Sequence, residues 1–349
     1  MADPPLVQLQ DFPQFTDLNN LVAEQTGAKV VFATDDWFAV TENLLKFGVF
    51  TDVWVNGWMV GKQEEGDIPG HDWSLYKCDR RGRWVLPATE SQLKLNLIDL
   101  DHRLGSQNWD EILPSTALKP GYKTSCHNFF DIKYNKRITH IRLNMFPDGG
   151  IARLRVYGRA SPDWKKISYQ QMVDLAAMEN GGICVGYSDV HFGHARNLIQ
   201  PGRAETMADG WETARKPGRP AILEADSQGI LQVPGQDWSM FRLGHPGVIT
   251  KIEIDTNHFK GNYPDSCTIE ACYVNDDKEN EIRQVFNSPP WKTLLAPKKL
   301  KAHHRQFFSG KDLNNCGVIS HVRLSMAPDG GISRMRLWGY KQSNRQAKL

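Results

Sequence analysis

Acidic, amide and guanidinium side chains gather in two short segments, residues 207–215 (MADGWETAR) and 254–264 (IDTNHFKGNYP). A carboxylate can act as a general base, carboxylate and amide oxygens accept N–H groups of a ligand, and an arginine can bind a carboxylate through two parallel hydrogen bonds. The alternative is that both segments are turns, with Trp211 and Phe259 in the core. The candidate site residues are Asp209, Glu212, Arg215, Asp255, Thr256 and Asn262.

Two further arginines follow the sequence PDGG near the end of the chain. Alternation along a strand places Arg334 and Arg336 on one side and Met335 and Leu337 on the other. Such a row is usually solvated or paired with a neighbouring domain, because arginine is mainly a surface residue. The functional alternative is a carboxylate clamp, for which Arg334 is the candidate.

The remaining patterns give little support to other chemistries. His191 and His194 are three residues apart, but no second pair of histidines or carboxylates completes a metal site. The sequence contains no GxSxG, Walker or dinucleotide-binding motif. We therefore predict no cofactor. The sequence predicts no metal site either, and leaves a requirement for a divalent metal as the alternative.

An internal repeat sets the framework that must position these residues. Residues 140–158 (HIRLNMFPDGGIARLRVYG) and 321–339 (HVRLSMAPDGGISRMRLWG) are identical at 12 of 19 positions. Residues 21–45 match residues 175–199, NGWMV (56–60) matches DGWET (209–213), and HDWS (71–74) matches QDWS (236–239). A repeat of this length indicates two copies of one domain.

The local patterns of both copies are mostly those of β-strands. Apolar and polar residues alternate on either side of PDGG, and again around Gly-His-Pro-Gly at 244–247, which predicts a hairpin at each place. Helical stretches are expected only near residues 18–24 and 172–178, ending before Gly27 and Gly181. We predict an all-β fold of two tandem antiparallel sandwiches.

The repeat also predicts the domain boundaries and the cellular setting. We expect a first copy at residues 1–160, a second at 161–340, a polar tail at 341–349 and a link at 159–168. A net charge of +2 gives no strong field for nucleic acid. No apolar run is long enough to cross a membrane, and the six cysteines show no CxxC pair, so we expect reduced thiols in a cytoplasmic protein. A homo-oligomer stays open.

Taken in order, these segments resemble the allantoicase family. The similarity covers nearly all of residues 20–340 and is most specific at DGWETAR, at IDTNHFKGNYP and at the two PDGG sequences. The resemblance implies two jelly-roll sandwiches related to galactose-binding domains. It also implies hydrolysis of allantoate to ureidoglycolate and urea, a step of purine breakdown.

Allantoate carries one carboxylate and two ureido groups, which explains the residue types. Arg215 and Arg334 suit the carboxylate, and Thr256 joins them among the expected binding residues. Glu212 or Asp255 is the expected general base. Asp209 is the third expected catalytic residue, and Asp209 and Asn262 complete the set of acceptors for N–H groups.

The first copy departs from this pattern. Asn56-Gly57-Trp58-Met59-Val60 lacks both acids of DGWET, and Lys62 stands in place of Arg215. Residues 74–105, from Ser74-Leu75-Tyr76-Lys77 onward, are expected to match nothing in the second copy. We therefore expect an eroded first copy, poorly packed over residues 75–108, and an activity that is weak or lost. The alternative is a non-catalytic binding protein that retains the sandwich fold.

Overall fold

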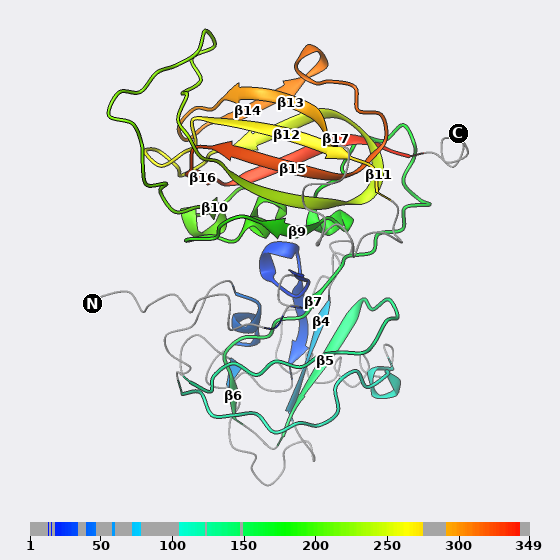
Figure 1. Cartoon of the computed structure of the whole chain (residues 1–349). Coiled ribbons are helices and arrows are strands. Elements are labelled where there is room, and N and C mark those ends of the chain that lie inside the picture. Colours follow the sequence, from blue (N-terminus) through cyan, green and yellow to red (C-terminus); the bar gives the residue numbers. More distant parts are fainter. Residues whose placement is uncertain are drawn as a thin grey trace, which may run out of the picture. The chain divides into compact units, whose positions relative to one another are not determined.

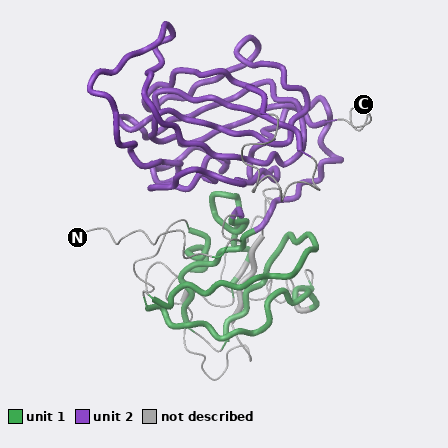
Figure 2. The backbone as a smooth tube through the Cα atoms, in the orientation of Figure 1, with its two compact units in different colours: residues 1–16, 20–157 green, residues 17–19, 158–349 purple. Residues whose placement is uncertain are grey.

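The chain forms two compact units (Figure 2). Their described residues form strands and short 3-10 turns. The computed structural model describes residues 13, 15, 18–33, 40–46, 58–59, 72–77, 105–122, 124–146, 149–274 and 291–342. One unit contains residues 1–16 and 20–157, and the other contains residues 17–19 and 158–349. These described ranges contain no α-helix, and none of their helical turns is long or apolar enough to span a membrane. The all-β prediction is confirmed.

The described residues of the second unit contain ten strands, most of which are labelled in Figure 1. Their pairing is antiparallel throughout the registers resolved for this unit. The strands are β8 (Val173–Asp174), β9 (Ile183–Tyr187), β10 (Trp211–Glu212), β11 (Asp237–Asp255), β12 (Ser266–Cys272), β13 (Lys292–Lys299), β14 (Arg305–Ser309), β15 (Ile319–Ala327), β16 (Gly331–Ile332) and β17 (Arg334–Lys341). The 3-10 turns are η6 (Met178–Asn180), η7 (Ala195–Ile199), η8 (Met207–Asp209) and η10 (Gly310–Asp312).

The 19-residue strand β11 connects the two sheets of the sandwich. Its first part, residues 237–242, pairs with β9 on one side and β15 on the other. Its last part, residues 251–255, pairs with β14 and β17. Strands β12 and β13 extend the first sheet beyond β15, and β8 extends the second beyond β17. The core between them contains Phe241, Ile252 and Leu337, all fully buried.

The predicted hairpin at residues 244–247 is wrong, because the two parts of β11 do not pair with each other. Gly247 is instead the point at which the strand passes between sheets, pairing with both Ile319 and Lys341. The glycines are required by close backbone approach. A Cβ on Gly244 would lie 1.9 Å from the Asn180 carbonyl oxygen, and one on Gly247 would lie 2.3 Å from the Tyr340 oxygen.

The predicted hairpin at PDGG in the second copy is also wrong. The flanking segments are strands, as expected, but β15 and β17 lie on opposite sides of β11 and do not pair with each other. PDGG therefore forms an arch between the sheets. Gly331 pairs instead with Glu212 of β10, which holds this arch against the segment that carries the candidate acid.

The two predicted helical stretches are strands followed by single 3-10 turns. In the second unit, the Asp174 carboxylate accepts hydrogen bonds from the amides of Ala176 and Leu337, at 3.2 and 2.9 Å. These bonds connect the segment to β17 and engage the Ala176 amide with a side chain, so residues 172–178 do not form a helix. The predicted ends are correct, since Gly27 and Gly181 have φ of 86° and 96° and close the turns η3 and η6.

The described part of the first unit repeats part of the framework of the second. Its strands are β2 (Lys29–Ala33), β3 (Trp58–Met59), β4 (Asp72–Lys77), β5 (His140–Met145) and β6 (Gly150–Ile151), and its turns are η3 (Glu24–Thr26), η4 (Thr41–Leu45) and η5 (Ser106–Asn108). Strands β1 (Asn19–Asn20) and β7 (Tyr157–Gly158) pair with each other at the boundary between the units. Asp72 pairs with Met145, as Asp237 pairs with Met326 at the corresponding positions. Both copies also carry a bulge in the next strand, at Val31 and at Val185.

These registers correct the expectation that the match between copies ends at Trp73. Ser74-Leu75-Tyr76-Lys77 continues β4 in the register of Ser239-Met240-Phe241-Arg242 in β11. The two segments have the same order of residue types, a serine, an aliphatic residue, an aromatic residue and a cation, although only the serine is identical. Residues 78–104, which hold most of the segment expected to pack poorly, lie outside the described residues.

The polar segment at residues 159–168 packs onto the second unit. Ile167 is buried in its core, and the Lys341 ammonium donates a 2.5 Å hydrogen bond to the carbonyl of Trp164. The five described cysteines are free thiols, and burial raises the pKa of Cys267 to about 12. The thiols of the described residues therefore contribute packing and no cross-links.

Candidate active site

Three segments of the second unit meet at strand β10. They are residues 205–216, residues 255–264 and the PDGG arch. Glu212 is opposite Gly331 in the β10–β16 pair, and the amide of Gly331 donates to the carbonyl of Asn262 at 2.8 Å. The Asn262 side chain in turn donates a 2.5 Å hydrogen bond to Glu212 Oε1. The acid and the amide that the sequence singles out are therefore in direct contact.

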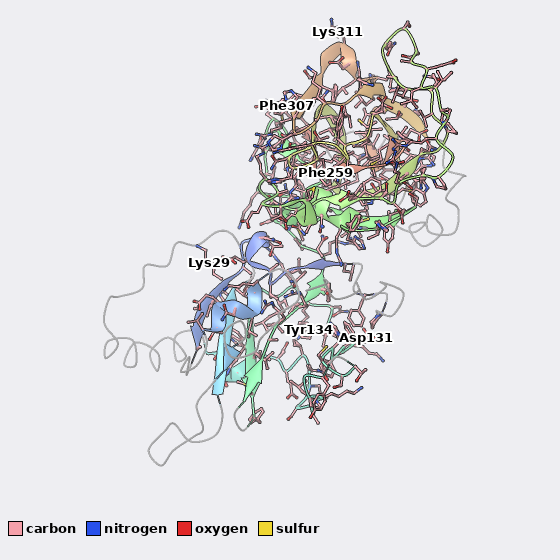
Figure 3. All side chains as sticks on the ribbon, turned by 90° about the vertical axis from the view of Figure 1, so that its left-hand side faces the viewer. Lys29, Asp131, Tyr134, Phe259, Phe307 and Lys311 are labelled. Carbon is pink, nitrogen blue, oxygen red and sulfur yellow. The ribbon has the colours of Figure 1, made fainter. Side chains whose placement is uncertain are left out.

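The ring of Phe259 explains why glycines recur at this junction. A Cβ on Gly331 would lie 1.9 Å from Phe259 Cε1, and one on Gly210 would lie 2.8 Å from Cε2 of the same ring. Phe259 is fully buried and lies inside the second unit (Figure 3). The two glycines allow the backbones of 210 and 331 to close on the ring, which brings Glu212 and Asn262 together.

Asp209 stabilises the turn that precedes Glu212. It ends η8, is buried, and its Oδ2 accepts the amides of Glu205 and Thr206 at 2.8 and 3.1 Å. This is a capping box, in which the Thr206 side chain binds the Asp209 amide in return. The carboxylate is thus engaged by backbone donors within its own turn.

Arg334 is buried and binds backbone carbonyls. Its NH1 donates to Asp209 at 2.6 Å and to Ser333 at 2.8 Å, and its Nε donates to Gly202 at 3.3 Å. Burial, with the neighbouring Arg336 charge, lowers its pKa to about 10. Arg336 lies on the same side of β17 and also reaches the Gly202 carbonyl, at 2.7 Å. Both guanidinium groups fasten residues 198–209 to the sheet.

Asp255 and Thr256 lie at the buried end of β11. The Asp255 carboxylate, which is fully buried, accepts from Arg203 Nε and the Asn257 amide, both at 3.0 Å. The Thr256 hydroxyl donates to the Lys301 carbonyl at 2.5 Å. Asp255 is opposite Arg334 in the β11–β17 pair, and its carbonyl accepts the amide of Ser333 at 2.8 Å. Ser333 follows strand β16, which pairs with Glu212, so the backbone connects Asp255 to the contact between Glu212 and Asn262.

Arg215 is placed differently from the other predicted residues. It is exposed, and in the part of the chain that the structure describes no hydrogen bond or ion pair engages its guanidinium. No hydrogen bond or ion pair joins it to Glu212, three residues earlier, within those same described ranges. Its charge is therefore available to a ligand anion.

Several supporting residues escaped the sequence reasoning. The Asn197 side chain donates to the Gly210 carbonyl at 2.9 Å, Asp189 Oδ2 accepts the Ala214 amide at 2.6 Å, and Asp329 Oδ2 accepts the Lys216 amide at 2.8 Å. A signal for them was present, because all three recur in the first copy as Asn43, Asp35 and Asp148. Identity between copies marks residues that hold the segment around Trp211.

The two loop histidines have separate roles. His194 is buried and accepts the Arg196 amide at its Nδ1, at 3.0 Å, which caps η7. His191 is exposed and its ring meets that of Phe192 edge to face. Within the described ranges, no three histidine, cysteine, aspartate or glutamate side chains form a group that could hold a metal ion.

The corresponding region of the first unit retains the pairing but not the acid. Trp58 and Met59 of β3 pair with Ile151 and Gly150, which matches Trp211 and Glu212 opposite Ile332 and Gly331. Methionine therefore occupies the register position of the candidate acid. The second unit alone combines the acid with the GNYP segment in this sequence.

Comparisons with known proteins agree with this architecture. A family model of the allantoicase repeat matches residues 19–86, 86–161 and 173–342, so the first copy is matched in two pieces and the second in one. A probable allantoicase of Stutzerimonas stutzeri is 37% identical over 344 residues, covering 92% of this chain and 95% of the relative. The allantoicase of Dictyostelium discoideum is 35% identical over 343 residues, covering 91% and 85%.

The solved structures include a close counterpart of the whole chain. The crystal structure of allantoicase from Saccharomyces cerevisiae superposes with a TM-score of 0.67 and 27% identity, covering 96% of this chain and 99% of the other. The coverage includes both copies of the repeat. The chain belongs to the allantoicase family.

Proposed function

We propose that this protein hydrolyses allantoate to ureidoglycolate and urea, at a site in the second unit built around Glu212 and Asn262. The observation that carries the proposal is the 2.5 Å hydrogen bond that joins these two residues where three repeat segments meet. It combines with the family membership of the chain, since the relatives are named allantoicases.

Glu212 is proposed as the general base. Its Oε1 accepts from Asn262, which leaves Oε2 for a water molecule or a ureido N–H. The water oxygen bonds to the central carbon of allantoate and gives a proton to Glu212. The bond from that carbon to one ureido nitrogen breaks, and the nitrogen takes up a proton to leave as urea. Asp255 is a poorer base, because its carboxylate is buried against Arg203 and the Asn257 amide.

The binding roles divide between ligand contact and support. Arg215 is proposed to bind the substrate carboxylate, since its guanidinium is exposed. Asn262 is proposed to contact a ureido group through its remaining polar atoms. Asp209, Thr256 and Arg334 are proposed to shape the site from behind, through the backbone contacts described above.

The assignment of copies and compartment is part of the proposal. We infer a first repeat at 1–160, a second at 161–340 and a tail at 341–349, supported by the two compact units and by the repeated strand registers. Free cysteines support a cytoplasmic location, since disulfides are common outside the cell. A net charge of +2 favours a small substrate over nucleic acid.

The test is release of urea from allantoate by the full-length chain. Glu212→Gln should lower the rate by about 10²–10⁴-fold, the usual effect of removing a positioned acid or base. Glu270→Gln is the matched control, because Glu270 pairs with Arg323 between β12 and β15 and takes no part in the site. Equal rates for wild type and Glu212→Gln would refute the role of Glu212. A wild type that binds allantoate without releasing urea would instead support the non-catalytic alternative.

We expect a turnover below that of ordinary enzymes, roughly 1–10³ per second. The first copy has Met59 and Lys62 at the positions of Glu212 and Arg215, so it adds no second site of this kind. At the site in the second unit, a displacement of about 1 Å from the productive geometry can cost about 10²-fold in rate. A wild-type rate within the ordinary range would contradict this expectation and leave the proposed reaction standing.

A further inference from the structure

The backbone on both sides of Arg215 is fastened to aspartate side chains. Asp189 Oδ2 accepts the amide of Ala214 at 2.6 Å, and Asp329 Oδ2 accepts the amide of Lys216 at 2.8 Å. The amide of Thr213 donates to the carbonyl of Gly330 at 3.0 Å, beside Asp329 in the PDGG arch. The backbone of residues 213–216 is therefore held at three of its four amides, those of Thr213, Ala214 and Lys216, although these residues lie outside any strand.

Two cationic side chains beyond Arg215 strengthen this attachment. Arg219 NH2 binds Asp329 Oδ1 at 2.7 Å, and Lys216 Nζ binds Asp237 Oδ1 at 2.7 Å. The carboxylates of Asp237 and Asp329 are both buried, whereas Lys216 and Arg219 are partly exposed, so solvent screens these ion pairs only in part. They also neutralise the two acids, which leaves the charge of Arg215 uncompensated within the described residues.

A cation on a fixed backbone is favourable for binding an anion. A flexible segment would lose conformational freedom when its arginine closes on a ligand, and this loss weakens binding. Here the segment is already ordered by hydrogen bonds that do not involve the guanidinium. The group that remains exposed and unpaired in the described structure is the one suited to a carboxylate.

We propose that Asp189 and Asp329 are positioning residues, which hold Arg215 so that its guanidinium receives the carboxylate of a ureido acid. This inference rests on the proposed function and assigns the substrate's carboxylate end to one part of the site. The PDGG sequence then has a task beyond turning the chain, because its aspartate connects the arch between the sheets to the binding arginine.

The sequence of the first copy supports a role for Asp189, Asp329 and Arg215 that is separate from the role of the proposed acid, Glu212. Asp35 and Asp148 stand at the positions of Asp189 and Asp329, and Lys62 at the position of Arg215. The acid itself is replaced by Met59. The first copy thus retains, at the matching sequence positions, a cationic residue and the two aspartates while lacking the acid, which fits a role of this set in holding an anion.

Two matched probes test the proposal by calorimetric titration of the full-length chain. Ureidoacetate carries one ureido group and a carboxylate, and ureidoacetamide replaces the carboxylate with a neutral amide. Arg215→Ala should weaken binding of ureidoacetate by roughly 10–100-fold, the value of a hydrogen bond to a charged group. Asp329→Asn and Asp189→Asn should each weaken it by roughly 3–10-fold. Binding of ureidoacetamide should change less than about twofold in all three.

Asp312→Asn is the control variant. Like the carboxylate of Asp329, that of Asp312 accepts hydrogen bonds from one cationic side chain, Lys298 at 2.8 Å, and from one backbone amide, that of Ser309. Asp312 lies in η10, which takes no part in the proposed site. It should leave both titrations unchanged. Thermal melting would show which variants fold, and if Asp329→Asn does not fold, Asp189→Asn tests the same proposal from the other side of Arg215.

Three results would overturn the inference. They are equal weakening of both probes by the aspartate variants, no weakening of ureidoacetate, and no preference of the wild type for the carboxylate. Urea release from allantoate, measured separately, distinguishes this failure from failure of the proposed function. A chain that releases urea but shows no dependence of carboxylate binding on Asp189 and Asp329 retains the function and loses the inference.

Discussion

At the scale of single residues, burial decides which polar groups can do chemistry. Arg334 and Asp255 are buried and their hydrogen bonds go to protein partners, whereas Arg215 is exposed and Glu212 is half-buried with one oxygen bound by Asn262. Polar groups taken out of water must find partners, and those partners then compete with any ligand. The residues proposed to react with or bind the substrate, Glu212 and Arg215, are therefore the ones at the edge of the core.

Asp174 gives a prediction at this scale. Burial raises the pKa of Asp174 to about 6 from 3.8, and the Arg336 charge offsets this only in part. The charged form therefore costs stability, fully above pH 6, and the cost disappears as the pH falls towards 4. The first copy has Asn20 at this position, where its side-chain oxygen accepts the amides of Val22 and Val156.

Asp174→Asn should therefore fold and should remove this pH dependence. Relative to the variant, the wild type should gain up to about 1.4 kcal/mol of unfolding free energy per pH unit as the pH falls from 6 to 4. Urea denaturation of both proteins at pH 4, 5, 6 and 7 measures the difference. A difference that is constant with pH would show that Asp174 titrates alike in the folded and unfolded chain.

At the scale of elements, a few glycines allow the arches and strands to approach. Gly331 faces the ring of Phe259 while its amide binds Asn262 and its strand pairs with Glu212. One position thus joins the core, the arch and the site. Its substitution should disturb all three, because close-packed interiors have no room for an added methyl group.

Gly331→Ala should lower the unfolding free energy by roughly 1–3 kcal/mol, the usual cost of overpacking. It should also reduce urea release, since the contact between Glu212 and Asn262 depends on this strand pair. Gly261→Ala is the matched control in the neighbouring segment, where a Cβ would meet nothing within 4 Å, and it should change stability by less than about 0.5 kcal/mol. Similar melting temperatures for the two variants would contradict the packing argument.

At the scale of the whole molecule, the two copies share a framework but not a site. Strands β2, β4 and β5 of the first unit pair in the same register as strands β9, β11 and β15 of the second. The bulge at Val31 in the first unit corresponds to the bulge at Val185 in the second. The acid and the GNYP segment belong to the second copy. Framework and chemistry are therefore separable within one chain.

The copies should accordingly differ in their effect on turnover. Asn56 of the first copy corresponds to Asp209 of the second. Asn56→Ala should leave urea release unchanged, whereas Glu212→Gln should lower it by about 10²–10⁴-fold. Initial rates of both variants at saturating allantoate measure this. A strong loss in Asn56→Ala would mean that the first copy contributes to the reaction.

The sequence alone determined the repeat, the β-rich character of both copies and the membership of the family. These follow from local alternation and from identity between segments, such as the PDGG sequences, which need no knowledge of contacts. It also singled out Glu212 and Asn262, which the structure brings into contact. The ends of the short turns at Gly27 and Gly181 were equally readable, because they depend on backbone conformation at one residue.

The tertiary structure decided which strands pair and which polar groups remain available. The segments flanking PDGG and those flanking residues 244–247 look like hairpins, yet β11 passes through both sheets, so that β15 and β17 each pair with it. Arg334 and Arg215 are both arginines beside a turn, but one is enclosed by carbonyls and the other faces solvent. Strand pairing and burial depend on contacts between residues far apart in the chain. Local alternation indicates on which face of the strand a side chain lies, but it does not indicate which residues pack against that face.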